Sequence, residues 1–101
     1  MCRKQELINT LELIPHPEGG YYKETYRSEG SISKNALPDD YSGDRSYSTG
    51  IYFMLTADTF SAFHKINQDE MWHFYDGAPI ELHMITVEGI YSCVHIGRDI
   101  E

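Results

Sequence analysis

The segment FHKINQDEMWHFYDG, at residues 63–77, holds the residue types that acid–base or metal chemistry would use. His64 ends one expected strand and Glu70 begins the next, so a hairpin turn can bring this imidazole and this carboxylate side by side. The pair could hold a metal ion, or the carboxylate could orient the imidazole and raise its basicity. We therefore predict that His64 is a catalytic base with Glu70 beside it. Metal binding by the same pair is the alternative.

Strand alternation separates the second histidine of this segment from the pair. With a period of two residues, Trp72 and Phe74 share the face of Glu70, whereas His73 points the other way. We therefore expect His73 to stay outside the centre formed by His64 and Glu70. Of the aromatic side chains in the sequence, Trp72 and Tyr22 are the ones that we expect to touch a ligand.

Length, charge and hydropathy limit what these residues could serve. A chain of 101 residues is long enough for one domain. The chain has 16 acidic and 8 basic residues and no basic cluster, which argues against nucleic acid as a partner. The N-terminus lacks the apolar core of a signal peptide, and no apolar run is long enough to span a bilayer. We expect a cytoplasmic protein with no membrane partner. Cys2 and Cys93 are expected to be reduced thiols without a redox role.

The elements that must position the site are mostly short strands. The apolar spacing of residues 3–11 predicts one amphipathic helix. The prolines and glycines of residues 15–20 predict a turn. Residues 29–46 are expected to form a long surface loop, which is either a plain connection or a lid. The expected strands, separated by short turns, cover residues 21–28, 47–56, 59–64, 70–76, 79–87 and 90–97. This spacing predicts an all-β sandwich or barrel with a short N-terminal α-helix.

Alternation in the first strand, YYKETYRS, assigns side chains to two faces. Tyr22, Glu24 and Tyr26 are expected on one face, and Lys23 and Arg27 on the other. Arg27 has two interpretations that we leave open: a buried ion pair with Glu24 or Glu70 that fixes the sheet, or a guanidinium that grips a carboxylate or phosphate.

The chain ends just after the last expected strand. About six strands are expected, where closed small barrels and jelly rolls usually have about eight. An open sheet edge of this kind is expected to be covered by another chain, which predicts a homodimer.

Three segments carry a resemblance to a known family. The spacing of His64, Glu70 and Gly77 is similar to the first cupin motif, although Ile66 stands where that motif has a second histidine. LIPHPEGGYYKETYRS, STGIYFML and FSAFHKINQDEMWHFYDGAPIELHMI, in this order, look like the cupin-5 family, formerly DUF985. The resemblance implies a cupin jelly-roll (double-stranded β-helix) β-sandwich. Residues 1–101 would form a single, partial cupin domain without the second cupin motif.

The same resemblance implies a chemistry. Members of that family resemble the metal-free, RmlC-like sugar-nucleotide epimerases, and GGYYKETY resembles the strand that surrounds the nucleotide there. By that likeness His64 is the general base, and Glu24 or Arg27 contacts the polar or anionic end of the substrate. The C-terminal strands that commonly supply the partner tyrosine acid are absent from the sequence.

Three functions remain open from the sequence. The favoured one is a small-molecule-binding cupin, an isomerase or epimerase acting on a sugar-like or carbonyl substrate, that needs no cofactor. The second is a cupin that binds a divalent metal through His64 and Glu70, supplemented by His83 or by a side chain of a partner chain. The third is a non-enzymatic binding module or truncated remnant.

Lone strand histidines are usually satisfied polar groups, which is the plainer interpretation of His16, His73, His83 and His95. The predicted substrate-binding residues are Tyr22, Glu24, Arg27, Glu70, Trp72 and His83.

Overall fold

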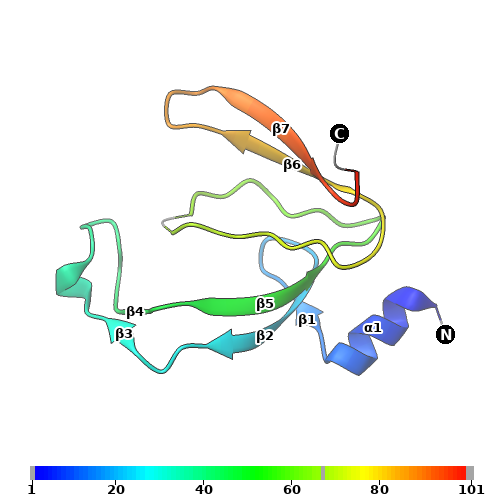
Figure 1. Cartoon of the computed structure of the whole chain (residues 1–101), viewed down its shortest axis with the longest axis horizontal. Coiled ribbons are helices and arrows are strands. Elements are labelled where there is room, and N and C mark those ends of the chain that lie inside the picture. Colours follow the sequence, from blue (N-terminus) through cyan, green and yellow to red (C-terminus); the bar gives the residue numbers. More distant parts are fainter. Residues whose placement is uncertain (1, 67, 100–101) are drawn as a thin grey trace. The chain divides into compact units, whose positions relative to one another are not determined.

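The structure is a computed structural model that describes residues 2–66 and 68–99. The chain divides into two compact units, residues 1–67 and 68–101, and each is described by itself. That residues 1–101 form a single partial cupin domain stays a prediction. The elements are α1 (Arg3–Leu11), β1 (Ile14–Pro15), β2 (Tyr21–Arg27), β3 (Ser31–Ile32), the 3-10 helix η1 (Lys34–Ala36), β4 (Arg45–Ser46), β5 (Thr49–Met54), β6 (Ile80–Ile85) and β7 (Tyr91–Ile96) (Figure 1).

The N-terminal helix has the bounds that the sequence predicts. Leu7, Ile8 and Leu11 are half-buried along one side of α1, as its apolar spacing requires. The helix ends before the first proline is reached, because Glu12 adopts the left-handed conformation with φ 57° and its amide caps the carbonyl of Ile8.

The turn between β1 and β2 depends on two consecutive glycines. Gly19 has φ +117°, and a Cβ placed on it would lie 1.8 Å from the carbonyl oxygen of Phe60. The amide of Ala62 donates to the carbonyl of Glu18 at 2.8 Å, so the chain leading to His64 lies directly against this turn. The paired glycines predicted as a turn therefore also allow two backbone segments to approach closely.

β1, β2 and β5 form an antiparallel three-stranded sheet with a bulge. Glu24 pairs with Ile51 and Tyr26 with Gly50, so the register shifts at Thr25. The extra residue reverses the alternation that follows it. The predicted faces are therefore wrong beyond Glu24: Tyr26 lies on the opposite face, and Arg27 returns to the face of Glu24.

The segment 29–46 is more ordered than a plain surface loop. β3 and β4 pair antiparallel, Ser31 with Ser46 and Ile32 with Arg45, and η1 lies between them. The loop therefore folds back on itself, while its role as a lid stays a prediction. Within the described residues, the hydrophobic side chains buried in unit 1 are those of Leu13 and Tyr41.

The second unit contains a regular hairpin. β6 and β7 pair without interruption from Ile80 with Ile96 to Ile85 with Tyr91. The amide of Gly89 donates to the carbonyl of Thr86 at 2.9 Å. Gly89 has φ +85°, a backbone conformation that residues with a side chain rarely adopt. A turn at Glu88 and Gly89 is thus confirmed, but it also includes Val87, because the amide of Thr86 donates to the carbonyl of Ile90 at 2.9 Å.

Two predicted strands do not form in the described part of the chain. Residues 59–64 and 70–76 are assigned no strand there, so they lack the ladder of backbone hydrogen bonds that a strand requires. The described strands form separate sheets of three, two and two strands. The strand-rich make-up with one short α-helix agrees with an all-β class, whereas closure into a jelly roll stays a prediction.

Candidate functional site

Three of the predicted substrate-binding side chains lie on one face of β2. Tyr22 pairs with Phe53, Glu24 with Ile51 and Arg27 with Thr49, and alternate positions of β5 share a face. The bulge at Thr25 is what adds Arg27 to Tyr22 and Glu24. The sequence analysis selected all three residues but placed Arg27 on the face opposite Tyr22 and Glu24, because the predicted strand did not contain the bulge.

The charged pair on this face lies at the surface. Arg27 donates from Nη2 to Oε1 of Glu24 at 2.5 Å and from Nη1 to Oγ of Ser46 at 3.1 Å. Hydrogen bonding to Glu24, and then its negative charge, raise the pKa of Arg27. The side chains remain 56% and 43% exposed, so the prediction of a buried pair is wrong and the pair is an exposed one. An incoming anion would have to compete with Glu24 for the guanidinium.

Tyr22 is held by aromatic contacts rather than left open. Its ring meets that of His16 edge-on at a centroid distance of 4.9 Å, and His16 meets Phe53 in the same way at 5.3 Å. The amide of Glu18 donates to Nδ1 of His16 at 3.1 Å. His16 is therefore the satisfied structural histidine that the sequence predicts, and Tyr22 is a half-buried part of the same packing.

His64 is exposed and has a defined ring orientation. Its Nδ1 lies 2.7 Å from the carbonyl oxygen of Ala62. A carbonyl oxygen only accepts hydrogen bonds, so Nδ1 carries the hydrogen and Nε2 of the neutral ring has the free lone pair. The orienting group in the structure is thus a backbone carbonyl, a partner that sequence patterns do not reveal.

The residues predicted around Glu70 keep the expected alternation of exposure. Trp72 is half-buried, whereas Met71 and Tyr75 are 83% and 71% exposed and His73 is also exposed. This pattern agrees with His73 facing away from Trp72, although these residues form no strand. The pairing of His64 with Glu70 joins the two units, so it stays a prediction, and so does a pairing of Arg27 with Glu70.

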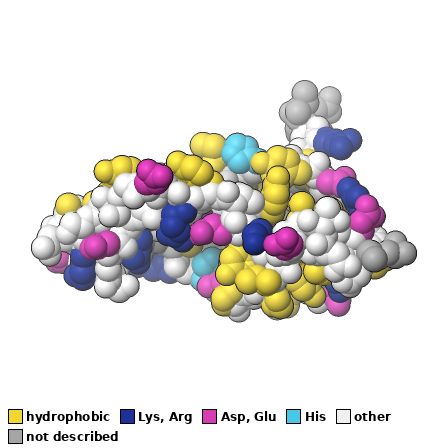
Figure 2. All heavy atoms as spheres, turned by 90° about the horizontal axis from the view of Figure 1, so that it is seen from below, with side chains coloured by type: hydrophobic (Ala, Val, Ile, Leu, Met, Phe, Trp, Pro, Cys, Tyr) yellow, Lys and Arg dark blue, Asp and Glu magenta, His cyan; other side chains and the backbone are white. Residues whose placement is uncertain are grey.

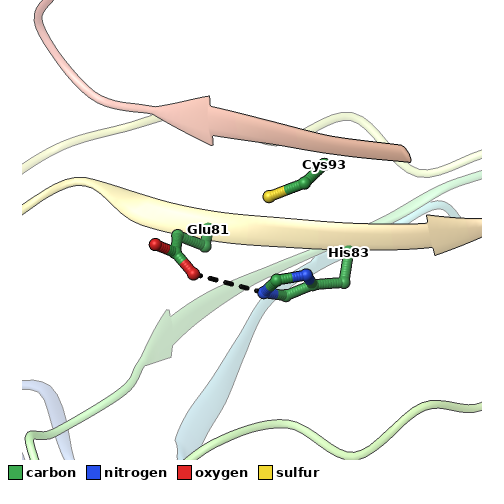
Figure 3. Close-up of side chains that lie close together, drawn as sticks. All are labelled: Glu81, His83 and Cys93. Carbon is green, nitrogen blue, oxygen red and sulfur yellow. Dashed lines mark ion pairs between the residues drawn. The ribbon is translucent and has the colours of Figure 1, made fainter. Parts of the chain in front are cut away.

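The sixth predicted substrate-binding residue, His83, belongs to a polar cluster on the β6–β7 hairpin. His83 pairs across the ladder with Cys93, and Glu81 pairs with His95, so these four side chains share one face. Nε2 of His83 lies 3.3 Å from Oε2 of Glu81, and Nε2 of His95 lies 3.6 Å from Oε1. Figure 3 shows the ion pair of Glu81 and His83 with the thiol of Cys93 on the neighbouring strand. The Glu81 carboxylate therefore lies between two imidazoles.

A phenol completes this cluster. The hydroxyl of Tyr91 lies 2.6 Å from Nδ1 of His83. Loss of water around the hydroxyl raises the pKa of Tyr91, and Cys93 and Glu81 raise it further. Glu81, Tyr91 and Cys93 were missed as site candidates. Counting outward from a two-residue EG turn would have placed Cys93 opposite Met84. Its pairing with His83 requires Val87 in the turn as well, because Thr86 pairs with Ile90.

Charged side chains of both signs are present at the surface. On the face that Figure 2 presents, Lys and Arg side chains are interspersed with Asp and Glu, and hydrophobic side chains lie in contiguous groups. Among the described residues, no helix has the length and apolar character that crossing a membrane requires.

Comparisons with known proteins give a consistent result. Residues 5–101 match the family described as Cupin superfamily (DUF985), Cupin_5. The Uncharacterized protein YML079W of Saccharomyces cerevisiae (strain ATCC 204508 / S288c) is 34% identical over 101 residues, covering 94% of this chain and 50% of that protein. The solved structure of a hypothetical protein from Leishmania major matches with a TM-score of 0.80 at 32% identity, covering 95% of this chain and 57% of that one. The chain thus spans about half the length of these relatives.

Proposed function

The chain belongs to the DUF985 family of the cupin superfamily, and from this premise we propose that it forms part of a small-molecule isomerase or epimerase in which His64 is the general base. The family match and the strand-rich structure support a cupin β-fold. Closure of that fold into a jelly roll belongs to the proposal. The substrate is sugar-like and carries a carbonyl group, whose neighbouring C–H is acidic enough for a histidine to deprotonate.

The observation that carries this proposal is the tautomer of His64. The hydrogen bond between Nδ1 and the Ala62 carbonyl, at 2.7 Å, leaves Nε2 as the proton acceptor. Nε2 removes the proton next to the carbonyl and the electron pair moves onto the carbonyl oxygen, giving an enolate. A proton from solvent water, delivered to the opposite face of that carbon, then restores the ketone with inverted configuration, and His64 releases its proton to solvent.

The face of β2 gives the substrate its expected contacts. Tyr22 offers an aromatic edge, while Glu24 and Arg27 offer a carboxylate and a guanidinium within hydrogen-bonding distance of each other. A hydroxyl-rich ligand with an anionic end can use both groups, the hydroxyls at Glu24 and the anion at Arg27. Glu70 and Trp72, in the second unit, also belong to the proposed substrate-binding residues.

Hydrogen–deuterium exchange tests the base directly. The 101-residue chain is incubated in D2O with a panel of ketoses and keto-sugar nucleotides, and deuterium at the carbon next to the carbonyl is followed by NMR. We expect His64→Gln and His64→Ala to lower the exchange rate by a factor of about 10² to 10⁴. The exposed His73 gives the matched control, since His73→Gln should exchange at the wild-type rate.

Two outcomes would remove the proposal. One is exchange in His64→Ala at the wild-type rate for every substrate that the wild type turns over. The other is the absence of catalysed exchange across the whole panel with a protein whose circular dichroism shows that it is folded.

Self-association is the second part of the proposal. Large apolar side chains are exposed on the β1–β2–β5 sheet and on the β6–β7 sheet, with Tyr52 at 41% and Val94 at 44%. We propose that a second copy covers such surface, forming a homodimer. Light scattering coupled to size-exclusion chromatography should give twice the chain mass, and a monomer at high micromolar concentration would contradict this.

A further inference from the structure

We propose that Glu81, His83 and Cys93 bind one transition-metal ion of the zinc class on the face of the β6–β7 hairpin. The site uses neither His64 nor Glu70. The sequence analysis placed a metal ion at that pair and named His83 only as an additional ligand. It is independent of the isomerase chemistry proposed above, so either can fail without the other.

The donor atoms are already gathered. One carboxylate oxygen of Glu81, one ring nitrogen of His83 and the Sγ of Cys93 all lie within 4.8 Å of one another. Ligands around a tetrahedral ion at about 2.0–2.3 Å lie roughly 3.3–3.8 Å apart, so rotamer adjustments of these exposed side chains suffice to close the set. Nε2 of His83 and Oε2 of Glu81, at 3.3 Å, already have such a separation.

The ligand types select the ion. A thiolate and an imidazole favour zinc and related transition metals, whereas Mg²⁺ and Ca²⁺ require oxygen ligands. Three protein ligands leave the fourth position of a tetrahedral ion for water or for another ligand. Nε2 of His95 lies 3.6 Å from Oε1 of Glu81, so this second imidazole contacts the carboxylate but is not one of the three gathered donors.

A supporting contact is in place behind the imidazole. With Nε2 on the ion, Nδ1 of His83 carries a hydrogen and donates it to the Tyr91 hydroxyl, at 2.6 Å. A phenol hydroxyl can accept this bond without adding a charge to the site. Metal-bound histidines commonly donate their other N–H to an oxygen in this way, which fixes the ring.

The hairpin itself holds the ligands in register. Cys93 is the direct cross-strand partner of His83, and Glu81 is two positions along the same strand from His83, so all three project from one face. The ladder has no irregularity from Ile80 to Ile85, and the site therefore needs no further chain segment to assemble.

Cobalt(II) titration of the metal-free, untagged 101-residue chain is the test. Cobalt takes zinc sites and reports a Cys ligand by a thiolate-to-metal charge-transfer absorption in the near ultraviolet. We expect this band in the wild type, its bleaching by one equivalent of Zn²⁺, and its loss in Cys93→Ser. Glu81→Gln and His83→Gln should weaken cobalt binding at least tenfold, and Tyr91→Phe by a factor of about 10 to 100.

The other cysteine is the matched control. Cys2→Ser removes an exposed thiol outside the hairpin and should leave the band and the affinity unchanged. Zn²⁺ should also slow alkylation of Cys93 by iodoacetamide and leave that of Cys2 unaffected, as measured by peptide mass spectrometry. The proposal is overturned if the folded wild type shows no band, if the band survives in Cys93→Ser, or if Zn²⁺ fails to protect Cys93.

Discussion

The β2–β5 ladder and the β6–β7 ladder are both antiparallel, yet they bring side chains together in different ways. In β2–β5 the register shifts at Thr25, and this shift places Arg27 beside Glu24. In β6–β7 every residue has its partner, and unbroken alternation gathers Glu81, His83 and Cys93. Side-chain alternation therefore predicts which residues meet in a regular ladder, and a single bulge is enough to reassign every later residue of a strand.

The largest expected effect distinguishes the turn that precedes β2 from the turn that joins β6 and β7. Gly19→Ala in the first unit should lower the free energy of unfolding by about 3 kcal/mol or more, because backbone strain adds to steric overlap. Its φ is +117°, and the new Cβ would lie 1.8 Å from the Phe60 carbonyl oxygen. Urea unfolding followed by circular dichroism measures the change.

The matched control is the glycine of the other turn. Gly89 has φ +85°, but a Cβ added to it would meet nothing within 4 Å, so Gly89→Ala should cost only the conformational penalty. That penalty is about 1 kcal/mol. If the two variants were equally stable, the close approach at Gly19 would not constrain the fold.

A smaller effect tests the contact that the bulge creates. Glu24→Gln removes the charge that pairs with Arg27 and should lower the melting temperature slightly at low ionic strength, because the pair is exposed. Added salt should shrink the difference, since it screens the attraction in the wild type. Glu88→Gln, in the β6–β7 turn, is the control and should leave the melting temperature unchanged. An effect of Glu24→Gln that is independent of salt would argue against an ion pair.

The smallest effect is a pKa change near the end of β5. The Thr56 hydroxyl donates to Oδ1 of Asp58 at 2.5 Å, and this bond is the main reason that the pKa of Asp58 is lowered. Thr56→Val should therefore raise this pKa toward its ordinary value, as read from a carboxyl NMR titration.

The sign of the pH dependence follows from the lowered pKa. The stability that Asp58 contributes is present above its unfolded pKa and is lost as the pH falls through its lower folded pKa. Below the folded pKa of Asp58, the wild type and Thr56→Val should therefore no longer differ in the part of their stability that depends on pH. A pKa of Asp58 that does not change in Thr56→Val would assign the shift to another cause.

Much of the fold was predictable because short-range patterns determine it. Apolar spacing located α1, alternation located β2, β5, β6 and β7, and turn residues located the connections. Alternating exposure from Met71 to Tyr75 also follows the predicted pattern, although Glu70 is exposed like Met71. The ladder that would make residues 70–76 a strand depends on long-range pairing. β3 and β4 were missed because two-residue strands carry no detectable period.

The candidate site was predictable in its residue types more than in its contacts. His64 was identified, but its partner in the structure is the backbone carbonyl of Ala62, which no side-chain motif encodes. Arg27 was identified, but the bulge that places it was not, although Gly50 opposite the bulge is a glycine inside a strand pattern. His83 was identified, whereas Glu81 and Cys93 were passed over because neither resembles part of a cupin motif.

The β6–β7 turn also has a consequence for the order of folding. Partners in this ladder are 6 to 16 residues apart in sequence, whereas those of β2 and β5 are 22 to 33 apart. Closing short loops costs less chain entropy, and hairpins form in about 1–10 μs. We therefore expect the β6–β7 amides to gain protection before those of β5 in pulse-labelled hydrogen exchange, and simultaneous protection would contradict this order. The face that carries Glu81, His83 and Cys93 would then exist early in refolding, when a metal ion could already select the correct hairpin register.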